Sequence, residues 1–337
     1  MSLIKTSALS FLATAVKMLS LLVINKVVAL TIGPTGVALI GQFQNFSQVA
    51  MTAAQGGVNQ GLIKYTAEYK EDEDKLTTLF STAVKIYLVC SFIVGFSTII
   101  FAEYLSIYFL DSSAYKLIFI LFGVFLPLYV INQALLAILN GLNEIRLFIS
   151  NNIIQSIYSL VFTSVLAYFF ELNGALIAMV TNQSVVLLIL LWRVRGHALI
   201  RLNMFKARFS IVHFKGLLGF AAMSLSSIVA VPLVHLFIRG YIGENLSWEA
   251  AGYWQSMWYI STMYLMVITT ALGVYYLPRL SELKDKKKIK TELRNGYKII
   301  MPVVLSLSIA IYLLHFYFLL SFRQCVSYFL GSWLAMS

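Results

Sequence analysis

The residues of this chain that suit an anionic ligand lie within or beside strongly apolar segments. Lys17 and Lys26 fall inside the first such segment, and Arg239 stands at the end of a later one. Ammonium and guanidinium groups bind phosphate oxygens, and a guanidinium can do so in bidentate fashion. All 14 acidic residues lie between the apolar segments or at their ends. Carriers of protons or sodium usually need a carboxylate inside the membrane, so this pattern favours an anionic ligand over a coupling cation.

The two lysines differ in what their positions predict. Nine residues at about 100° each place Lys17 and Lys26 on opposite sides of a straight helix, so one cavity cannot hold both without a bend. Lys26 lies near the end of its segment, where the alternative is that the ammonium group extends to the membrane surface. Lys17 lies near the middle, and we expect it to face a partner or a water-filled cavity.

Amide and hydroxyl side chains supply a second kind of chemistry. In residues 36–60 they recur at helical spacing within an arc of roughly 80°, and similar runs lie in 148–170 and 252–277. Such groups suit sugar hydroxyls, and tyrosine rings suit sugar faces. The alternative is hydrogen bonding between helices. The predicted ligand-binding residues of this kind are Asn45, Gln48, Gln55, Asn59, Gln255 and Tyr259.

Metal-dependent and acid–base catalysis find little support in the sequence. Cys90 and Cys325 do not form a disulfide framework, and the four histidines are scattered, so we predict no metal site and no cofactor. A membrane polymerase or glycosyltransferase would need a general base or a metal-binding cluster of carboxylates. No HExxH motif and no pair of acids occurs inside an apolar segment. We therefore expect no catalytic residues.

The elements that position these side chains must be membrane-spanning helices. Charged residues make up only 12% of the 337 residues, against about 25% in soluble domains. The apolar residues come in blocks of about 20, long enough to cross a hydrocarbon core, and only helices satisfy their backbone there. We predict an all-α, polytopic transmembrane helix bundle without a cleaved signal peptide. Its roughly nine spans are expected at residues 7–31, 36–60, 78–101, 116–139, 148–170, 174–193, 216–238, 252–277 and 298–320.

The basic residues predict the orientation of the bundle. If the N-terminus is cytoplasmic, 19 of the 25 lysines and arginines lie on the cytoplasmic side, and Lys116, Arg239 and Arg323 lie on the other. Positive charge collects in cytoplasmic loops, so we predict a multi-pass protein with a cytoplasmic N-terminus. The basic runs flank membrane spans, which favours contact with anionic membrane lipid and argues against a nucleic-acid partner.

The longest basic connection divides the spans into six and three. We expect an N-terminal six-helix lobe at 1–195, a basic cytoplasmic linker at 196–215, a partial C-terminal lobe of about three helices at 216–320, and an off-pattern tail at 321–337. A weak similarity between the exits of the second and eighth spans favours two related halves, as in many transporters. The short second half predicts a C-terminally truncated chain.

Four short motifs resemble a known family of transporters. They are Ile32-Gly33-Pro34-Thr35-Gly36, Gly61-Leu62-Ile63-Lys64-Tyr65, Trp248-Glu249-Ala250-Ala251-Gly252-Tyr253-Trp254-Gln255 and Tyr275-Tyr276-Leu277-Pro278-Arg279-Leu280-Ser281. Together they resemble the Wzx-type O-antigen and lipid III (enterobacterial common antigen) flippases. These belong to the polysaccharide transporter family of the multidrug/oligosaccharidyl-lipid/polysaccharide exporter (MOP) superfamily. The resemblance runs from residue 1 to about 320.

The resemblance implies a two-lobed MOP-type fold with a central cavity that works by alternating access. The implied cargo is an undecaprenyl-diphosphate-linked oligosaccharide repeat unit, carried from the cytoplasmic to the periplasmic leaflet of a bacterial inner membrane. Lys17 and Lys26 fall at basic positions of the family's first helix. A polysaccharide polymerase and a chain-length regulator are further candidate partners. Roughly three C-terminal helices of the family pattern are missing.

Two other functions stay open at this point. A cation-coupled multidrug antiporter of the same superfamily would share the fold, but the acid-free spans and the four motifs argue against it. An inactive, truncated fragment of a flippase is the second alternative. We therefore expect a transporter rather than an enzyme.

Overall fold

The computed structural model describes residues 3–195, 205, 207–271, 294, 301, 302, 305, 306 and 309. In this part of the chain every regular element is helical. The elements are α1 (Leu3–Ala54), α2 (Asn59–Glu68), α3 (Glu73–Ile100), α4 (Ala102–Leu110), η1 (Ser113–Tyr115), α5 (Lys116–Gly141), α6 (Ile145–Val194), α7 (Ile211–Asn245) and α8 (Trp248–Ala271). The ninth predicted span, 298–320, falls outside the described residues except at single positions.

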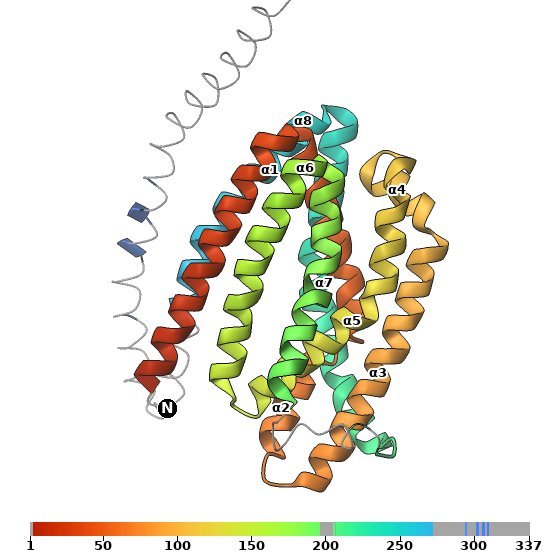
Figure 1. Ribbon diagram of the computed structural model, residues 1–337, viewed down its shortest axis with the longest axis vertical. Helices are drawn as coiled ribbons and strands as arrows, with labels where there is room; N and C mark the ends of the chain where they lie inside the picture. The colour runs from red at the N-terminus through yellow and green to blue at the C-terminus, as the bar shows by residue number, and fades with distance from the viewer. Residues whose placement is uncertain are drawn as a thin grey trace, which may run out of the picture. The chain divides into compact units, whose positions relative to one another are not determined.

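Helices α1 and α6 each consist of two legs joined at a break, and each therefore contains two of the predicted spans (Figure 1). Gly33 breaks α1 with φ 75°, which glycine adopts without steric cost, and Pro34 then begins the second leg. Glu171 breaks α6 with φ 49°. Figure 1 shows both breaks at the same end of the helices, together with the junction between α7 and α8. The first and second expected spans therefore form one broken helix, and the fifth and sixth form another.

Two predicted boundaries are wrong. The second span does not run to residue 60, because α1 ends at Ala54 and the chain turns through Gly56 and Gly57, both with positive φ. Gln55 therefore lies in the turn, and Asn59 begins α2. The seventh span does not end at 238. Helix α7 continues to Asn245, so Arg239 lies inside a helix and not in a connection.

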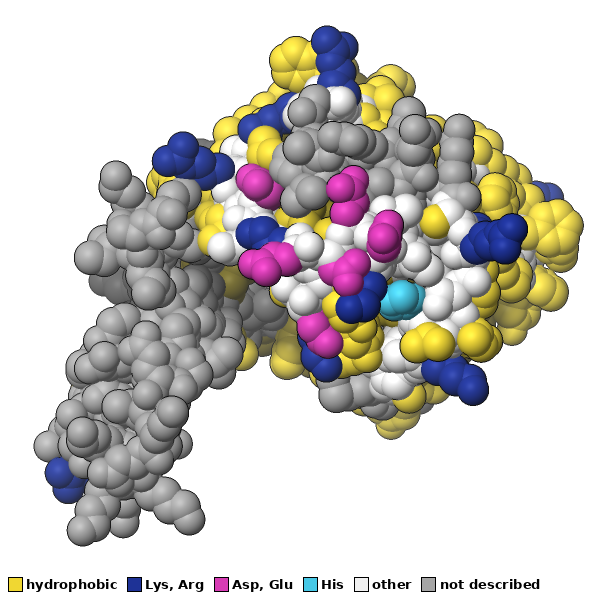
Figure 2. Space-filling model, turned by 90° about the horizontal axis from the view of Figure 1, so that it is seen from below, with side chains coloured by type: hydrophobic (Ala, Val, Ile, Leu, Met, Phe, Trp, Pro, Cys, Tyr) yellow, Lys and Arg dark blue, Asp and Glu magenta, His cyan; other side chains and the backbone are white. Residues whose placement is uncertain are grey.

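The packing of the helices is consistent with a lipid environment. In the described part, α1, α3, α5 and α6 each contain a stretch long and apolar enough to cross a membrane. Large apolar side chains remain exposed along their outer faces, for example Phe92 and Phe96 on α3 at 62% and 66%. An exposed apolar surface of this extent indicates contact with lipid. Charged side chains gather instead at the end that carries the α2–α3 turn (Figure 2).

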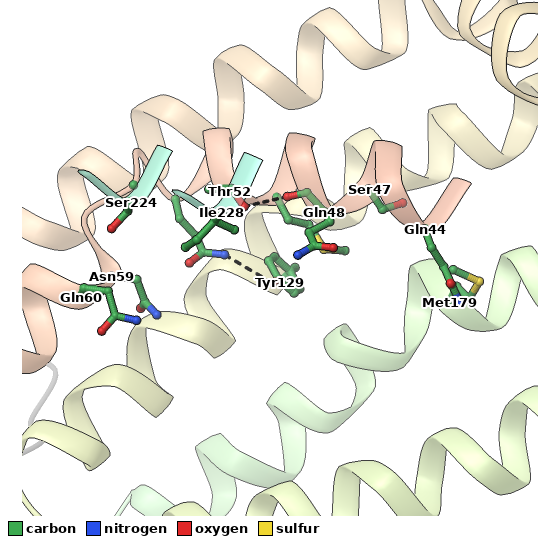
Figure 3. Close-up of a pocket in the computed structure, with 13 residues that line it drawn as sticks. Gln44, Ser47, Gln48, Thr52, Asn59, Gln60, Tyr129, Met179, Ser224 and Ile228 are labelled. Carbon is green, nitrogen blue, oxygen red and sulfur yellow. Dashed lines mark hydrogen bonds between the residues drawn. The ribbon is translucent and has the colours of Figure 1, made fainter. Parts of the chain in front are cut away.

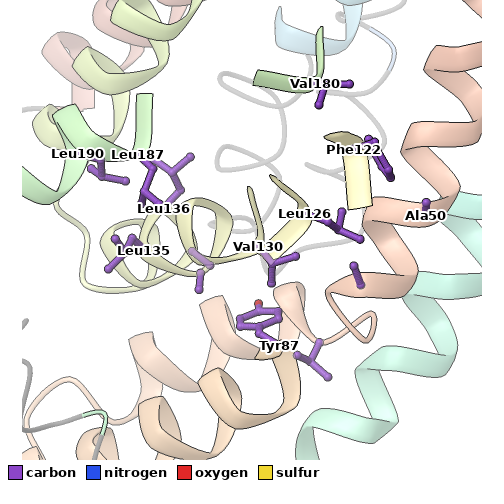
Figure 4. Close-up of a cluster of buried hydrophobic side chains, with 14 of the residues drawn as sticks. Ala50, Tyr87, Phe122, Leu126, Val130, Leu135, Leu136, Val180, Leu187 and Leu190 are labelled. Atoms are coloured by element: carbon purple, nitrogen blue, oxygen red, sulfur yellow. The ribbon is translucent and has the colours of Figure 1, made fainter. Parts of the chain in front are cut away.

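The interior is built mainly from side chains of α1, α3, α5 and α6, with smaller contributions from α2, α4 and α7 (Figure 4). Leu126 and Val130 of α5 are buried against Tyr87 of α3. Phe43 of α1 meets Phe119 and Phe122 edge to face, with ring centroids 5.5 and 5.9 Å apart. Contacts divide the chain into two compact units, residues 1–259 and 260–337, and the site described below lies wholly within the first.

Candidate functional site

A polar cavity of about 340 Å³ lies inside the first unit (Figure 3). The second leg of α1 and the turn after it supply most of its wall: Gln44, Ser47, Gln48, Met51, Thr52, Gln55 and Gly57. Four other helices complete it with Asn59 and Gln60 of α2, Tyr129 of α5, Met179 of α6, and Ser224 and Ile228 of α7. The wall is therefore rich in amides and hydroxyls, and none of these lining side chains carries a charge.

Helical periodicity brings the α1 side chains to one wall. Residues 44, 48, 51 and 55 follow the i, i+3, i+4 spacing that places side chains on one face. The Thr52 hydroxyl donates to the backbone carbonyl of Gln48 at 2.7 Å, one turn earlier in the helix. Gln48 is exposed. These side chains present hydrogen-bond donors and acceptors to any molecule in the cavity.

Hydrogen bonds from other helices hold part of the wall in place. Gln55 Nε2 donates to the Tyr129 hydroxyl at 3.3 Å (Figure 3). This bond uses the amide nitrogen, so the side-chain oxygen of Gln55 can accept a hydrogen bond from a ligand. The Tyr87 hydroxyl donates to Asn59 Oδ1 at 3.2 Å. The wall is thus partly preorganised, with amide atoms left over for a ligand.

A second polar group, the Arg239 cluster, consists of Gln42, Asn45, Arg239 and Gln255. Arg239 is fully buried. Its Nη1 donates to Gln42 Oε1 at 2.8 Å, and its Nη2 donates to Gln255 Oε1. With the Asn45 amide oxygen turned toward Arg239, that oxygen accepts from Nη1 and Nη2 at 3.2 and 3.1 Å. The Trp254 ring lies 5.6 Å from Arg239 Cζ. All these partners of the guanidinium are electrically neutral.

The cluster lies between the cavity and the end of the helices at Gly33. Along the second leg of α1, Gln42 and Asn45 come first after Gly33 and Gln48 and Gln55 come later. At 1.5 Å per residue, Gln42 and Gln55 are about 20 Å apart along the axis. Tyr259 links the two groups, since its hydroxyl donates to Gln44 Oε1 at 2.6 Å.

The predicted site residues fall into three groups. Gln48, Gln55 and Asn59 line the cavity. Asn45, Arg239, Gln255 and Tyr259 lie in or beside the Arg239 cluster. Lys17 and Lys26 are exposed on the first leg of α1 and do not line the cavity. The polar run of 148–170 supplies no lining residue either.

Several lining residues were not predicted from the sequence. Gln44 precedes Gln48 by four residues, and extension of the same stripe toward Gly33 would have found it. Gln60 lies just beyond the predicted end of the stripe. Tyr129 and Met179 stand among apolar residues of α5 and α6, and no pattern marks them. In the described residues, no group of three histidine, cysteine, aspartate or glutamate side chains is arranged to hold a metal ion.

Comparison with solved structures shows the fold. The chain superimposes on an inward-facing MATE-family multidrug resistance transporter of the MOP superfamily with a TM-score of 0.67 and 17% identity, covering 90% of this chain and 73% of that one. A MATE transporter in the straight conformation gives a TM-score of 0.65 at 18% identity, over 93% and 72%. The chain therefore has a MATE-like transporter fold over most of its length.

Comparison with sequences shows the family. A lipid III flippase of Escherichia coli (strain K12) is 26% identical over 323 residues, which cover 93% of this chain and 76% of that protein. A putative O-antigen transporter of Shigella flexneri is 24% identical over 325 residues, covering 90% and 74%. Both relatives are named as transporters and not as enzymes. The family model described as polysaccharide biosynthesis protein matches residues 3–284, and the chain belongs to that family.

Proposed function

We propose that this protein is a flippase for an undecaprenyl-diphosphate-linked oligosaccharide repeat unit of the O-antigen or enterobacterial common antigen type. It carries the unit from the cytoplasmic to the periplasmic leaflet of the bacterial inner membrane by alternating access. Family membership and the two named relatives support a transporter of this class.

The observation that carries the proposal is the chemistry of the cavity. Its polar wall consists of neutral amides and hydroxyls, which match sugar hydroxyls in both donor and acceptor capacity. At its end toward Gly33 stands a buried guanidinium with neutral partners. A head group made of sugars and a diphosphate fits this combination of neutral polar wall and neighbouring cation.

The site residues divide the work between the two parts of such a head group. Gln48, Gln55 and Asn59 bind sugar hydroxyls in the cavity. Asn45, Gln255 and Tyr259 border the position of the diphosphate, which Arg239 binds. Lys17 and Lys26 attract the anionic head group from exposed positions on the first leg of α1, outside the cavity.

The wider assembly follows the same proposal. The first six spans form one lobe at residues 1–195, and residues 216–320 contribute to a second lobe beyond the 196–215 linker. The N-terminus is cytoplasmic, as the distribution of basic residues indicates. The lipid-linked product then passes to a polysaccharide polymerase and a chain-length regulator.

A cation-coupled multidrug antiporter is the second candidate, because the fold is also that of MATE transporters. Such a carrier needs a carboxylate in its pathway to bind the coupling ion. No acidic side chain lines the described cavity, which favours the flippase.

Complementation tests the proposal. The chain is expressed in bacteria that lack their own repeat-unit flippase, and the amount of lipid-linked oligosaccharide exposed on the periplasmic side is measured. We expect exposure to be restored. If exposure is not restored and the purified protein instead drives drug efflux with a proton or sodium gradient, the antiporter is correct.

A further inference from the structure

Arg239 joins three helices at the end of the bundle nearest Gly33. It belongs to α7, its Nη1 bonds Gln42 of α1, and its Nη2 bonds Gln255 of α8. Gln42 and Gln255 are themselves 4% and 3% exposed. The guanidinium therefore ties α1 to α7 and α8 in a place that solvent does not reach.

The amide partners accept hydrogen bonds from the two terminal nitrogens of Arg239 but bring no negative charge to balance the guanidinium. An unpaired charge in a low-dielectric interior is costly, and amide dipoles offset only part of that cost. Nε of Arg239 is buried and has no hydrogen-bond partner among the described residues. A diphosphate offers acceptor oxygens that match the guanidinium fork and also supplies negative charge. A diphosphate is thus a better partner for Arg239 than the amides that hold it in this structure.

The seam between α1 and α8 leaves no room for a ligand while the amides remain in place. A Cβ atom added to Gly41 would lie 2.8 Å from Gln255 Cδ and 3.0 Å from Arg239 Cζ. Near the break in α1, Gly252 of α8 packs directly against the Pro34 carbonyl. A ligand can reach Arg239 only if these helices separate.

The cavity is coupled to this seam through α8. Gln44 lines the cavity and accepts a hydrogen bond from Tyr259 at 2.6 Å. Tyr259 follows Gln255 by four residues, one turn along the same helix. A head group that displaces Gln44 therefore acts on the helix that carries an amide partner of Arg239.

We propose that the Arg239 cluster is a latch that a diphosphate releases. The diphosphate displaces the Gln42 and Gln255 oxygens from the guanidinium, and α1 then separates from α7 and α8 at the Gly33 end. This inference rests on the proposed function and adds to it the trigger that opens one end of the pathway.

The latch makes predictions of opposite sign for two neighbouring residues. Arg239→Gln removes the charge that binds the diphosphate, so binding weakens by roughly tenfold or more, the order expected for hydrogen bonds to a charged group. Gln255→Leu removes a competing acceptor but keeps the charge, so the diphosphate binds several-fold tighter. A cluster that only holds the fold together would weaken binding in both variants or in neither.

The experiment uses the full chain in nanodiscs of neutral phosphatidylcholine. Spin labels at Thr35, just after the break in α1, and at Leu246, between α7 and α8, report the separation of the helices by double electron–electron resonance. The probes are undecaprenyl diphosphate, sodium pyrophosphate and uncharged undecaprenol. We expect undecaprenyl diphosphate to lengthen the distance in the unmodified protein and undecaprenol to leave it unchanged. Gln255→Leu should show the longer distance before any probe is added.

Each outcome decides a separate question. If pyrophosphate also lengthens the distance, the diphosphate alone releases the latch. If only undecaprenyl diphosphate does so, the lipid tail must bring the diphosphate to Arg239. Both results support the latch. If undecaprenyl diphosphate binds but both variants bind it like the unmodified protein, the latch is wrong and the proposed function stands. If the unmodified protein binds no diphosphate, both are wrong.

Discussion

Tyr259 donates a hydrogen bond to Gln44 at 2.6 Å, although 215 residues separate them in the sequence. The bond joins α8 to the second leg of α1 where the cavity ends and the Arg239 cluster begins. Two polar runs that look independent in the sequence therefore belong to one connected polar path.

Tyr259→Phe should lower the stability of the folded protein by about 1 kcal/mol, because it removes one hydrogen bond and leaves the Gln44 oxygen without this donor. The thermal unfolding midpoint in detergent measures the change. Tyr168→Phe is the matched control, since Tyr168 is 71% exposed on α6. An equal loss in both variants would contradict the structural role of the Tyr259 hydroxyl.

Gln48→Ala should lower flipping several-fold without changing the unfolding midpoint, since the Gln48 amide faces the cavity and its removal takes away hydrogen bonds to the cargo. Periplasmic exposure of lipid-linked oligosaccharide in flippase-deficient cells is the measurement. Gln155→Ala removes the same group from α6 outside the cavity wall and should leave flipping unchanged. Equal activity of the unmodified protein and both variants would show that Gln48 does not bind the cargo.

Leu126→Ala should destabilise the fold by about 2–5 kcal/mol, because Leu126 is 1% exposed in the core between α5 and its neighbours, and the cavity left behind loses packing contacts. Thermal unfolding in nanodiscs measures this loss. Phe96→Ala deletes a larger side chain that is 66% exposed on α3, and we expect a much smaller effect. The reverse order would mean that the face of α3 is buried against protein.

The ion pair between Glu103 of α4 and Lys116 of α5 should lose its contribution to stability only at acidic pH. Lys116 Nζ lies 2.8 Å from Glu103 Oε2, and this hydrogen bond lowers the pKa of Glu103 below its ordinary value of 4.5. A carboxyl group with a lowered pKa in the folded protein stabilises the fold at pH values above its ordinary pKa. This contribution is lost as the pH falls through the lowered pKa. A carboxyl titration followed by infrared spectroscopy should place the midpoint of Glu103 below 4.5. Lys116→Ala should move it back up, and an unchanged midpoint would contradict the pairing.

The helices were largely predictable because hydrophobic length in a membrane is a local property. Each apolar block must form a helix where it stands, so most boundaries in α3, α5 and α6 agree within a few residues. One exception is α7, which continues to Asn245. The other is the end of the second span, where Gln55 and Asn59 lie beyond the end of α1. An apolar average does not register the turn that Gly56 and Gly57 impose between them.

The cavity was predictable only on one side. The stripe on α1 is a periodic pattern within one helix, so Gln48 and Gln55 were found from the sequence. Tyr129 and Met179 reach the same cavity from α5 and α6, and neither belongs to a periodic polar pattern that would show which way its side chain points. Lys17 and Lys26 show the opposite case, since their chemistry suits the proposed cargo but both are exposed on the first leg of α1 and neither lines the cavity.

By itself the sequence determined that this chain forms membrane helices of a transporter family, with polar side chains that suit a sugar-linked anion. Those properties depend on composition and on spacing within one helix. Only the tertiary structure decided which polar residues meet. It buried Arg239 among amides of α1 and α8, because the break at Gly33 and the extension of α7 to Asn245 bring three distant segments to one level of the bundle. Contacts of that kind depend on how helices pack, and no pattern along one helix encodes them.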